Sequence, residues 1–304
     1  MLKVLSFIGK LILWLAAAIV AVLALVVLVI AVRYWTWTPD PLADFYGEHE
    51  VLNFAHRGAR EAAPENTLSA FLTAEAMGAH GVELDVMLSS DGRMVVIHDY
   101  ELDRTTDGGG LVKGHTFDHI RGLDAGSWFD EAFTGERVPT LEEVVEMLDP
   151  GMLINIELKT ESPATDGLES AVVELIQRYD LHNRVVVSSF NPIALLRVQQ
   201  EDKDIPVGLL YNSSGEMSAN PVLDHILKKG WFIPILRPEQ LHPEYKMVDE
   251  KYVEWAHKKG FRINAYTVNE AADLKRMLDL KVDGIITDRP DQLRKHMQDR
   301  GLDN

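Results

Sequence analysis

Hydrophobic and polar positions divide the chain into an apolar N-terminal run and a longer part in which short apolar segments alternate with amphipathic ones. Every residue from Leu11 to Val32 is apolar, and a helix of about 20 such residues spans the hydrocarbon core of a bilayer. Lys10 and Arg33 bracket this run, and aromatic residues follow it at once, as at a membrane–water interface. We therefore predict a membrane anchor in residues 1–33, with the span over 11–32.

A cleaved signal peptide is the alternative interpretation of this run. Its apolar region usually has about 7–15 residues and ends at a small-x-small cleavage site. The run here is longer, and the sequence YWTWTPDP after it offers no such site, so we favour an uncleaved anchor. Lys3 and Lys10 precede the span, whereas acidic residues soon follow it. This asymmetry predicts a single-pass protein with a cytoplasmic N-terminus and the remaining chain on the outer, periplasmic or extracytoplasmic side.

Beyond a predicted juxtamembrane linker over residues 34–50, the pattern is that of an α/β protein. Several predicted strands are continuous apolar runs, which is typical of strands buried on both faces. Strands alternating with helices favour a parallel sheet, and this many units favour a (β/α)8 TIM barrel over residues 51–304. The predicted strands are 51–55, 82–86, 94–98, 153–158, 185–188, 207–211, 232–236, 262–266 and 284–287, and the predicted helices are 67–77, 141–148, 168–179, 192–200, 221–229, 249–259 and 270–278.

Nine strands are one more than the barrel needs. The turn LSSDGR before Met94 is too short for a crossover helix, so we predict a hairpin of the second and third strands with one of them outside the barrel. From Asp103 to Thr140 the alternation lapses and glycines become frequent. We predict an insertion there, over about residues 103–140, that shapes the mouth of the barrel. Asn66 or Thr67 is the expected N-cap of the helix over 67–77.

Charge and composition narrow the function classes. The formal net charge is −17, and the first 33 residues hold no acidic residue, so the negative charge lies on the rest of the chain. Such a surface repels polyanions, which argues against a nucleic-acid partner. The chain has no cysteine, which excludes disulfides, thiolate metal sites and a cysteine nucleophile.

Polar side chains stand at the ends of four predicted strands, where a barrel core otherwise favours Val, Ile and Leu. Residues i and i+2 of a strand point to the same face, so pairs with this spacing converge on one place. Structural histidines and an inward salt-bridge network are the alternative interpretation of each piece taken alone. The four strand ends carry His56 with Arg57, Glu83 with Asp85, His98, and Glu157 with Lys159.

These residues together describe phosphodiester cleavage. Three carboxylates aimed into one cavity repel one another, and a hard divalent cation with oxygen ligands, Mg²⁺ or Ca²⁺, removes that repulsion. Two histidines serve as general acid and general base near neutral pH. Arg57 and Lys159 supply positive charge for an anionic group.

A series of motifs carries a family resemblance that covers nearly everything from Phe54 to Pro290. The motifs are AHRGAREAAPENT, GVELDVMLSSDGRMVVIHDYELDRTTDGGG, VPTLEEVVEML, INIELK, VVSSFNP, AYTVN and DGIITDRP. With them the chain resembles the glycerophosphodiester phosphodiesterase family, and the resemblance implies a TIM barrel with an insertion after the strand that ends in His98. The family usually has an aromatic residue, often Trp, before the TVN segment. This chain has Tyr266 there, which we expect to line the pocket, and Phe190 is a further candidate for its mouth.

The resemblance also assigns roles. It implies that His56 and His98 are the catalytic acid/base pair and that the three carboxylates bind one divalent cation. It implies phosphate contacts and a supporting polar residue as well. The implied metal ligands are Glu83, Asp85 and Glu157, and the implied substrate-binding residues are Arg57, Lys159, Glu65 and Tyr266.

The expected reaction is metal-dependent hydrolysis of a glycerophosphodiester to glycerol 3-phosphate and an alcohol. A lysophospholipase D that acts on lysophospholipids is the closest alternative, because the anchor places the enzyme beside lipid. A non-catalytic barrel that binds a lipid head group is the remote alternative, since a fold alone does not guarantee a function.

Overall fold

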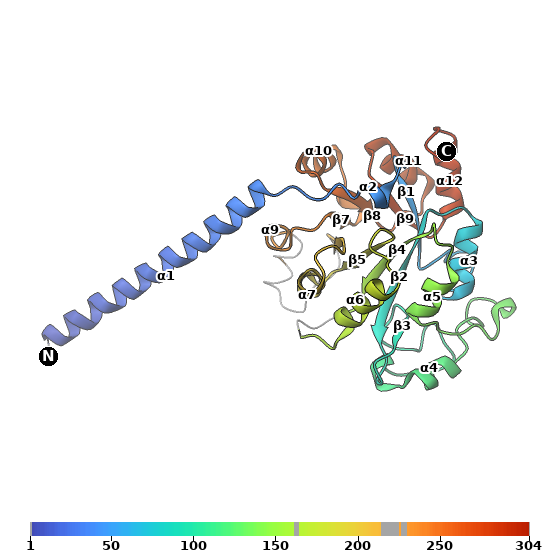
Figure 1. Ribbon diagram of the computed structural model, residues 1–304, viewed down its shortest axis with the longest axis horizontal. Coiled ribbons are helices and arrows are strands. Elements are labelled where there is room, and N and C mark those ends of the chain that lie inside the picture. Colours follow the sequence, from blue (N-terminus) through green and yellow to red (C-terminus); the bar gives the residue numbers. More distant parts are fainter. Residues whose placement is uncertain (1, 161–163, 214–224, 226–229, 304) are drawn as a thin grey trace.

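A closed barrel of parallel strands, with a long helix projecting from it, forms the protein (Figure 1). The structure is a computed structural model that describes residues 2–160, 164–213, 225 and 230–303. Helices surround the barrel, and the N-terminal helix α1 extends far beyond it. The predicted (β/α)8 fold is therefore confirmed.

The strands of the described residues alternate with helices, as the sequence pattern predicts. The strands are β1 (Leu52–His56), β2 (Gly81–Leu88), β3 (Met94–Val96), β4 (Leu153–Leu158), β5 (Val185–Ser189), β6 (Val207–Tyr211), β7 (Gln240–Pro243), β8 (Arg262–Ala265) and β9 (Gly284–Thr287). The α-helices are α1 (Leu2–Thr36), α2 (Ala43–Tyr46), α3 (Leu68–Ala76), α4 (Phe117–Gly122), α5 (Leu141–Met147), α6 (Leu168–Arg178), α7 (Pro192–Glu201), α9 (Ile233–Leu236), α10 (Glu250–Lys259), α11 (Ala271–Leu280) and α12 (Pro290–Gln298).

The hairpin resolves the excess of strands. β1 pairs in parallel with both β2 and β9, so eight strands close on themselves, and β3 pairs only with β2, antiparallel to it. The predicted hairpin is thus present, and β3 is the strand outside the barrel. A short turn forces this arrangement because a parallel pair needs a longer crossover.

One predicted strand, over 232–236, is wrong. The segment forms the short helix α9, and the barrel strand of this unit is β7. Pro234 cannot donate a ladder hydrogen bond, but it fits the first turn of a helix. The sequence QLHP of β7 has no apolar alternation, because Gln240 and His242 lie buried inside the barrel and bond to each other at 2.9 Å. The predicted helix over 221–229 lies outside the described residues, apart from His225.

Residues 97–140 join β3 to α5 and contain only short elements: α4 and the 3-10 helices η1 (Val112–Gly114) and η2 (Glu131–Phe133). They have a small core of their own around Ile97, Leu102 and Ile120. The Asp124 carboxylate tightens the outer loop by accepting three backbone N–H bonds, at 2.6–2.9 Å.

The N-terminal end of the barrel is filled by the segment that joins it to α1. Phe45 and Tyr46 of α2 are buried and pack against Leu52 and Leu153, near the first residues of β1 and β4. The Tyr46 hydroxyl lies 3.2 Å from Asn264 Oδ1 within the barrel. Residues of the predicted linker 34–50 are therefore part of the packed domain.

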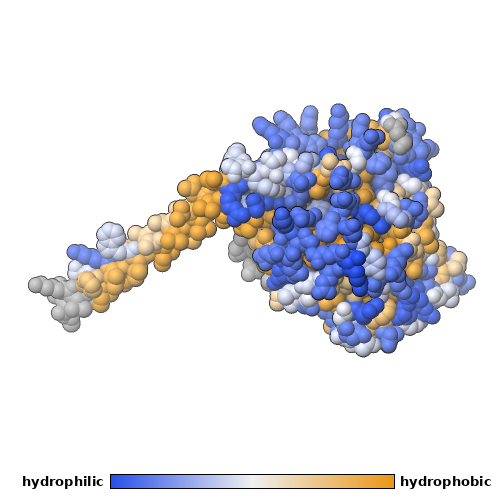
Figure 2. All heavy atoms as spheres, viewed as in Figure 1, coloured by the Kyte–Doolittle hydropathy of each residue, from blue (hydrophilic) through white to orange (hydrophobic). Residues whose placement is uncertain are grey.

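Helix α1 is apolar along most of its length and projects away from the barrel (Figure 1). The stretch Ser6–Thr36 is long and apolar enough to cross a membrane, and its most apolar 18-residue window is unburied. Near its end, Tyr34 packs against the core of the domain. Figure 2 shows this helix as a bare hydrophobic rod beside a largely polar domain. A membrane anchor and a signal sequence both have this property.

Candidate active site

Strands β1, β2 and β4 lie side by side and carry most of the predicted chemistry. Their register places His56 beside Glu83 and Asp85 beside Glu157. Partners in adjacent strands share a face, as do residues i and i+2 of one strand. These side chains therefore meet inside the barrel towards the C-terminal ends of its strands, and His98, just after β3, lines the same cavity as His56.

Glu83, Asp85 and Glu157 form a buried acidic triad. Each offers one carboxylate oxygen, and the three oxygens lie within 4.8 Å of one another. Burial, and then the charges of Asp85 and Glu157, raises the pKa of Glu83 well above its usual range. Asp85 Oδ1 is buried and, among the described residues, receives no hydrogen bond. Carboxylate oxygens are the ligands of hard divalent ions, so this set fits a metal ion.

Lys159 offsets part of the triad's negative charge. Its Nζ lies 2.9 Å from Glu157 Oε1 and 3.6 Å from Asp85 Oδ1. Burial favours the neutral amine, but the charges of Glu157 and Asp85 outweigh it and raise the pKa of Lys159 above its ordinary value. This predicted phosphate contact is therefore a buried cation already engaged with the acidic triad.

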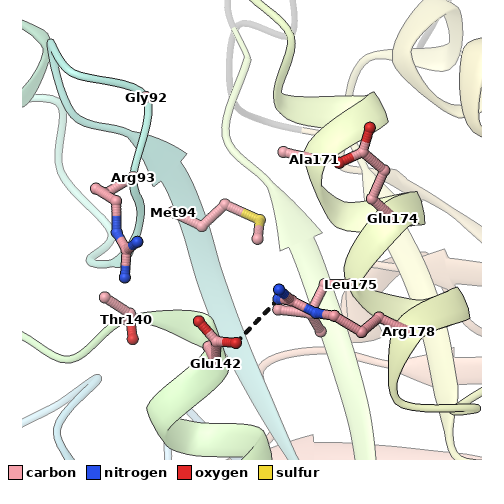
Figure 3. A pocket seen from close by; sticks show the side chains of 9 residues that line it. All are labelled: Gly92, Arg93, Met94, Thr140, Glu142, Ala171, Glu174, Leu175 and Arg178. Atoms are coloured by element: carbon pink, nitrogen blue, oxygen red, sulfur yellow. Dashed lines mark ion pairs between the residues drawn. The ribbon is translucent and has the colours of Figure 1, made fainter.

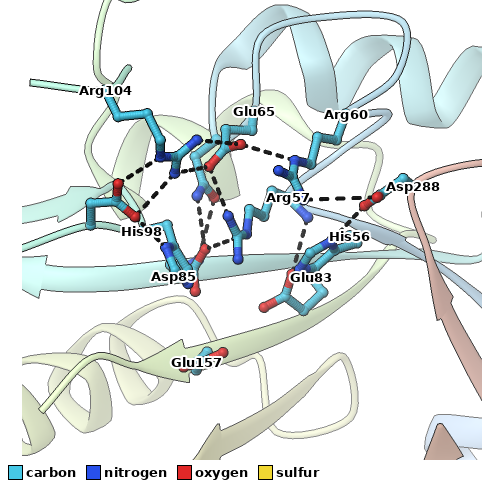
Figure 4. A network of polar contacts seen from close by, with 12 residues as sticks. His56, Arg57, Arg60, Glu65, Glu83, Asp85, His98, Arg104, Glu157 and Asp288 are labelled. Carbon is cyan, nitrogen blue, oxygen red and sulfur yellow. Dashed lines mark hydrogen bonds and ion pairs between the residues drawn. The ribbon is translucent and has the colours of Figure 1, made fainter. Parts of the chain in front are cut away.

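Glu65 is the centre of an arginine cluster (Figure 4). Its carboxylate accepts bonds from Arg57 Nη1 at 2.8 Å and Arg104 Nη2 at 2.7 Å, and Arg60 Nε lies 2.9 Å away. Burial alone would raise its pKa, but the Arg104 bonds and the neighbouring charges lower the pKa of Glu65 to about 2. Arg57 also approaches Asp85, with Nε 3.2 Å from Oδ2. Glu65 thus positions the arginines and links them to the triad.

Each candidate histidine is paired with a carboxylate through Nδ1. His56 Nδ1 lies 2.6 Å from Asp288 Oδ1, and His98 Nδ1 lies 2.6 Å from Asp99 Oδ1. Such a bond fixes the ring and leaves Nε2 for proton transfer. In His56 this Nε2 is 4.0 Å from Glu83. Burial lowers the pKa of His56 despite Asp288, which favours its neutral form near pH 7.

One cavity of about 330 Å³ brings the polar residues and several apolar side chains together. Tyr266 lines it, as predicted, and its hydroxyl donates to the Tyr211 carbonyl oxygen at 3.0 Å. Phe190 lies edge-on to Tyr266, with ring centroids 6.0 Å apart. The wall therefore has an apolar side opposite a charged one. Its lining is His56, Arg57, Arg60, Glu83, His98, Asn155, Glu157, Lys159, Phe190, Leu210, Tyr266, Thr267 and Ile286.

A second cavity, of about 420 Å³, lies on the outside of the barrel between β3, α5 and α6 (Figure 3). It contains Arg178, which is paired with Glu142 at 3.0 Å, and none of the predicted site residues. The predicted site residues therefore gather at the smaller cavity within the barrel.

Comparison with known proteins identifies the family. A family model described as glycerophosphoryl diester phosphodiesterase family matches residues 56–292. The chain belongs to this family. It is 40% identical over 246 residues to a glycerophosphodiester phosphodiesterase of Caldanaerobacter subterraneus subsp. tengcongensis, across 80% of this chain and 96% of the relative. A glycerophosphodiester phosphodiesterase of Bacillus subtilis is 35% identical over 293 residues, across 90% and 97% of the two chains.

A solved structure supports the same assignment. The phosphodiesterase of Oleispira antarctica, solved in complex with the product sn-glycerol-3-phosphate, superposes with a TM-score of 0.69 at 30% identity. The match covers 81% of this chain and 96% of that one. The chain is therefore a phosphoric diester hydrolase of the glycerophosphodiester phosphodiesterase class.

The structure adds residues to the candidate site that no sequence pattern singled out. Asp288 holds His56, and Arg104 joins Glu65 to Asp99 with its Nε 2.6 Å from Asp99 Oδ2. Asp288 follows directly on β9, in the motif DGIITDRP. Its position after a strand, like that of the other polar residues, was the signal available.

The N-cap of α3 is Thr67, whose hydroxyl accepts from Ala70 N. Asn66, the other candidate, has a positive φ of 58° and donates its side-chain amide to Asp85 Oδ2 at 2.9 Å. Asn66 thus orients a carboxylate of the phosphodiesterase triad.

Proposed function

We propose that the chain hydrolyses glycerophosphodiesters to glycerol 3-phosphate and an alcohol, with His56 and His98 as its acid/base pair and one divalent ion on the acidic triad. The observation that carries this proposal is the common cavity. Both histidines line it together with Glu83 and Glu157, and the third carboxylate, Asp85, lies directly beside Glu157.

The triad of Glu83, Asp85 and Glu157 is the proposed metal site. Its donors are all carboxylates, which suits Mg²⁺ or Ca²⁺. When bound, such an ion would stabilise the negative charge that develops on the phosphoryl oxygens. Lys159 and Arg57 contribute fixed positive charge beside the same carboxylates and are the proposed contacts of the phosphate.

The histidines move protons at Nε2, since Nδ1 of each is held by a carboxylate. One removes the proton from the attacking oxygen, and the other protonates the alcohol that leaves. The attacking oxygen belongs to water or to the 2-hydroxyl of the glycerol. Recovery of a cyclic glycerol phosphate from a brief reaction identifies the second route.

The deciding experiment is an assay of the full chain on glycerophosphocholine after EDTA treatment and after addition of Mg²⁺ or Ca²⁺. We expect activity to vanish with EDTA and to return with one of the two ions. His56→Ala and His98→Ala should each lower turnover by about 100- to 10,000-fold, while His119→Ala, an exposed histidine on α4, should leave it unchanged. Full activity in either active-site variant would refute the acid/base assignment.

A lysophospholipid is the second substrate candidate, and the apolar wall of the cavity favours it. Phe190, Leu210 and Ile286 offer a surface that a water-soluble diester does not need. Turnover of lysophosphatidylcholine compared with that of glycerophosphocholine separates the two. Turnover of the lysolipid alone would contradict the proposal that a glycerophosphodiester is the substrate.

We further propose that α1 is an uncleaved anchor with a cytoplasmic N-terminus and the barrel on the outer side of the membrane. Lys3 and Lys10 before the span support this orientation. Protease treatment of intact cells tests it. The barrel should be digested from outside, and protection of the barrel would reverse the orientation.

A further inference from the structure

Exposed large apolar side chains of the domain gather beside the end of α1. In the described part of the chain after residue 32, seven such residues are exposed, and four of them lie on the end of α1, just before or on α9, and on α10. The exposed fractions are 80% for Trp35, 60% for Trp231, 47% for Ile235 and 42% for Trp255. We call these four residues the α9–α10 patch. The other three, Leu72, Leu111 and Trp128, lie on α3 and on the 97–140 segment.

Ring contacts link Trp255 of the patch to Trp37, the residue directly after α1. Phe261 contacts Trp37 with centroids 5.7 Å apart and Trp255 with centroids 5.6 Å apart. The guanidinium of Arg237, directly after α9, lies 5.9 Å from the ring of Trp37. Helices α1 and α9 pack against each other (Figure 1). The patch therefore begins where the apolar helix ends.

Lys259, the last residue of α10, fixes this junction. Its Nζ donates to the carbonyl oxygens of Tyr34, at 2.6 Å, and Trp37. It also lies 4.7 Å and 5.3 Å from the centres of the same two rings. An ammonium that bonds the last carbonyls of a helix stabilises its C-terminus. The end of α1 is thus clamped to the barrel, and the patch holds a fixed position relative to the apolar rod.

We propose that the α9–α10 patch is a membrane-contact surface, seated in the headgroup region of the bilayer that α1 spans. Tryptophan is enriched at that depth because its ring is apolar and its N–H is polar. The occupant is lipid rather than a partner protein because the patch continues a helix that is long and apolar enough to cross a membrane and whose most apolar part is unburied. The inference rests on the proposal that α1 stays attached as an anchor.

The patch is separate from the site of chemistry. The residues that join α1 to the barrel lie at the N-terminal end of the barrel strands. There Thr38 and Pro39 approach Gly260, just before β8. The acidic triad and His56 lie towards the C-terminal ends of the strands. Changes in the patch should therefore alter how the barrel meets the bilayer without altering the hydrolysis of a water-soluble diester.

The chain has no cysteine, so a single introduced cysteine can be labelled and its depth in the bilayer measured. Ile235→Cys places one thiol in the patch, and Leu111→Cys places one at a similarly exposed apolar position on the 97–140 segment, which lies far from α1 in Figure 1. Each full-length variant is labelled with an environment-sensitive fluorophore and reconstituted in phosphatidylcholine vesicles that contain lipid with a quenching nitroxide near the top of its acyl chain.

We expect the label at 235 to lose at least half of its emission, and the label at 111 to lose less than about a tenth. Equal, weak quenching at both positions overturns the proposal, as does failure of the chain to float with the vesicles. If Ile235→Cys does not fold, Trp255→Cys takes its place with the same expectation. The fold of each labelled variant is checked by thermal unfolding. Because quenching needs no turnover, an inactive wild-type chain would refute the proposed function and leave this measurement valid.

Discussion

At the C-terminal ends of its strands the barrel buries charges, whereas at the N-terminal ends it buries aromatic rings. Glu83 and Asp85 are almost inaccessible to solvent and lie close to each other, and buried like charges destabilise a fold. Phe45 and Tyr46 at the opposite end gain free energy by leaving water. The candidate site therefore costs stability and the aromatic end supplies it, so substitutions at the two ends should separate activity from stability.

The largest effect is expected for Glu157→Gln at the charged end. Loss of one metal ligand should lower kcat/KM by about 1,000-fold, since an ion that stabilises phosphoryl charge contributes several kcal/mol. The metal-free variant should nevertheless melt close to the metal-free wild type, because the loss of repulsion within the triad offsets the loss of the ion pair with Lys159. Glu174→Gln, at an exposed position on α6, is the matched control. A fall in both activity and melting temperature would argue for a structural role of Glu157.

Phe45→Ala should produce the reverse at the aromatic end. Truncation of a buried Phe costs about 3–5 kcal/mol of unfolding free energy, measured by denaturant titration of the full chain in detergent. Below the melting transition, kcat/KM should stay within about two-fold of wild type, because Phe45 and the triad lie at opposite ends. A large loss of activity in the folded variant would show that the two ends are coupled.

Asp288→Asn should have a smaller effect on catalysis than removal of a histidine. The variant keeps the shape of the side chain but loses the charge that holds His56, and outer partners of this kind contribute about 10- to 100-fold. The pH–rate profile should shift as well, since Asp288 raises the pKa of His56 against the effect of burial. An unchanged profile together with lower stability would make Asp288 a structural residue only.

Glu239→Gln tests the N-terminal end of the barrel through the pH dependence of stability. We expect it to leave catalysis unchanged. Burial, with a contribution from Asp40, raises the pKa of Glu239 from 4.5 to about 7. When folding raises the pKa of a carboxyl, the folded protein loses stability as the pH rises from 4.5 through 7. The Gln side chain can still accept the bond from Val207 N. Between pH 4.5 and pH 8, the unfolding free energy of the variant should therefore rise by about 2 kcal/mol relative to that of wild type. A constant difference across this range would contradict the assignment.

Sequence alone predicted the barrel and the acidic triad because both follow periodicity. Apolar runs predict strands that are buried on both faces. The i, i+2 spacing of Glu83 and Asp85 predicts that both side chains lie on one face of their strand. It did not predict β7, whose inward residues Gln240 and His242 are polar and bond to each other. Such a strand has no apolar signal, whereas the apolar run over 232–236 imitates one.

The partners of the site residues were also beyond sequence reasoning. Arg104 reaches Glu65 across 39 positions, and Asp288 reaches His56 across 232. Contacts over such separations depend on how the barrel closes, which no local pattern states. The candidate Asn66 was interpreted as a helix cap, although its left-handed backbone instead turns its amide to Asp85.

The contact between Lys259 and the end of α1 limits how far the barrel can move relative to that helix. A flexible linker of 17 residues would let a tethered domain wander by roughly 20–25 Å. Here the carbonyls of Tyr34 and Trp37 are held by the barrel itself, and Phe45 is part of its core. If α1 is the proposed uncleaved anchor, the barrel stands at one height and in one orientation relative to the membrane, and substrate has to reach it there.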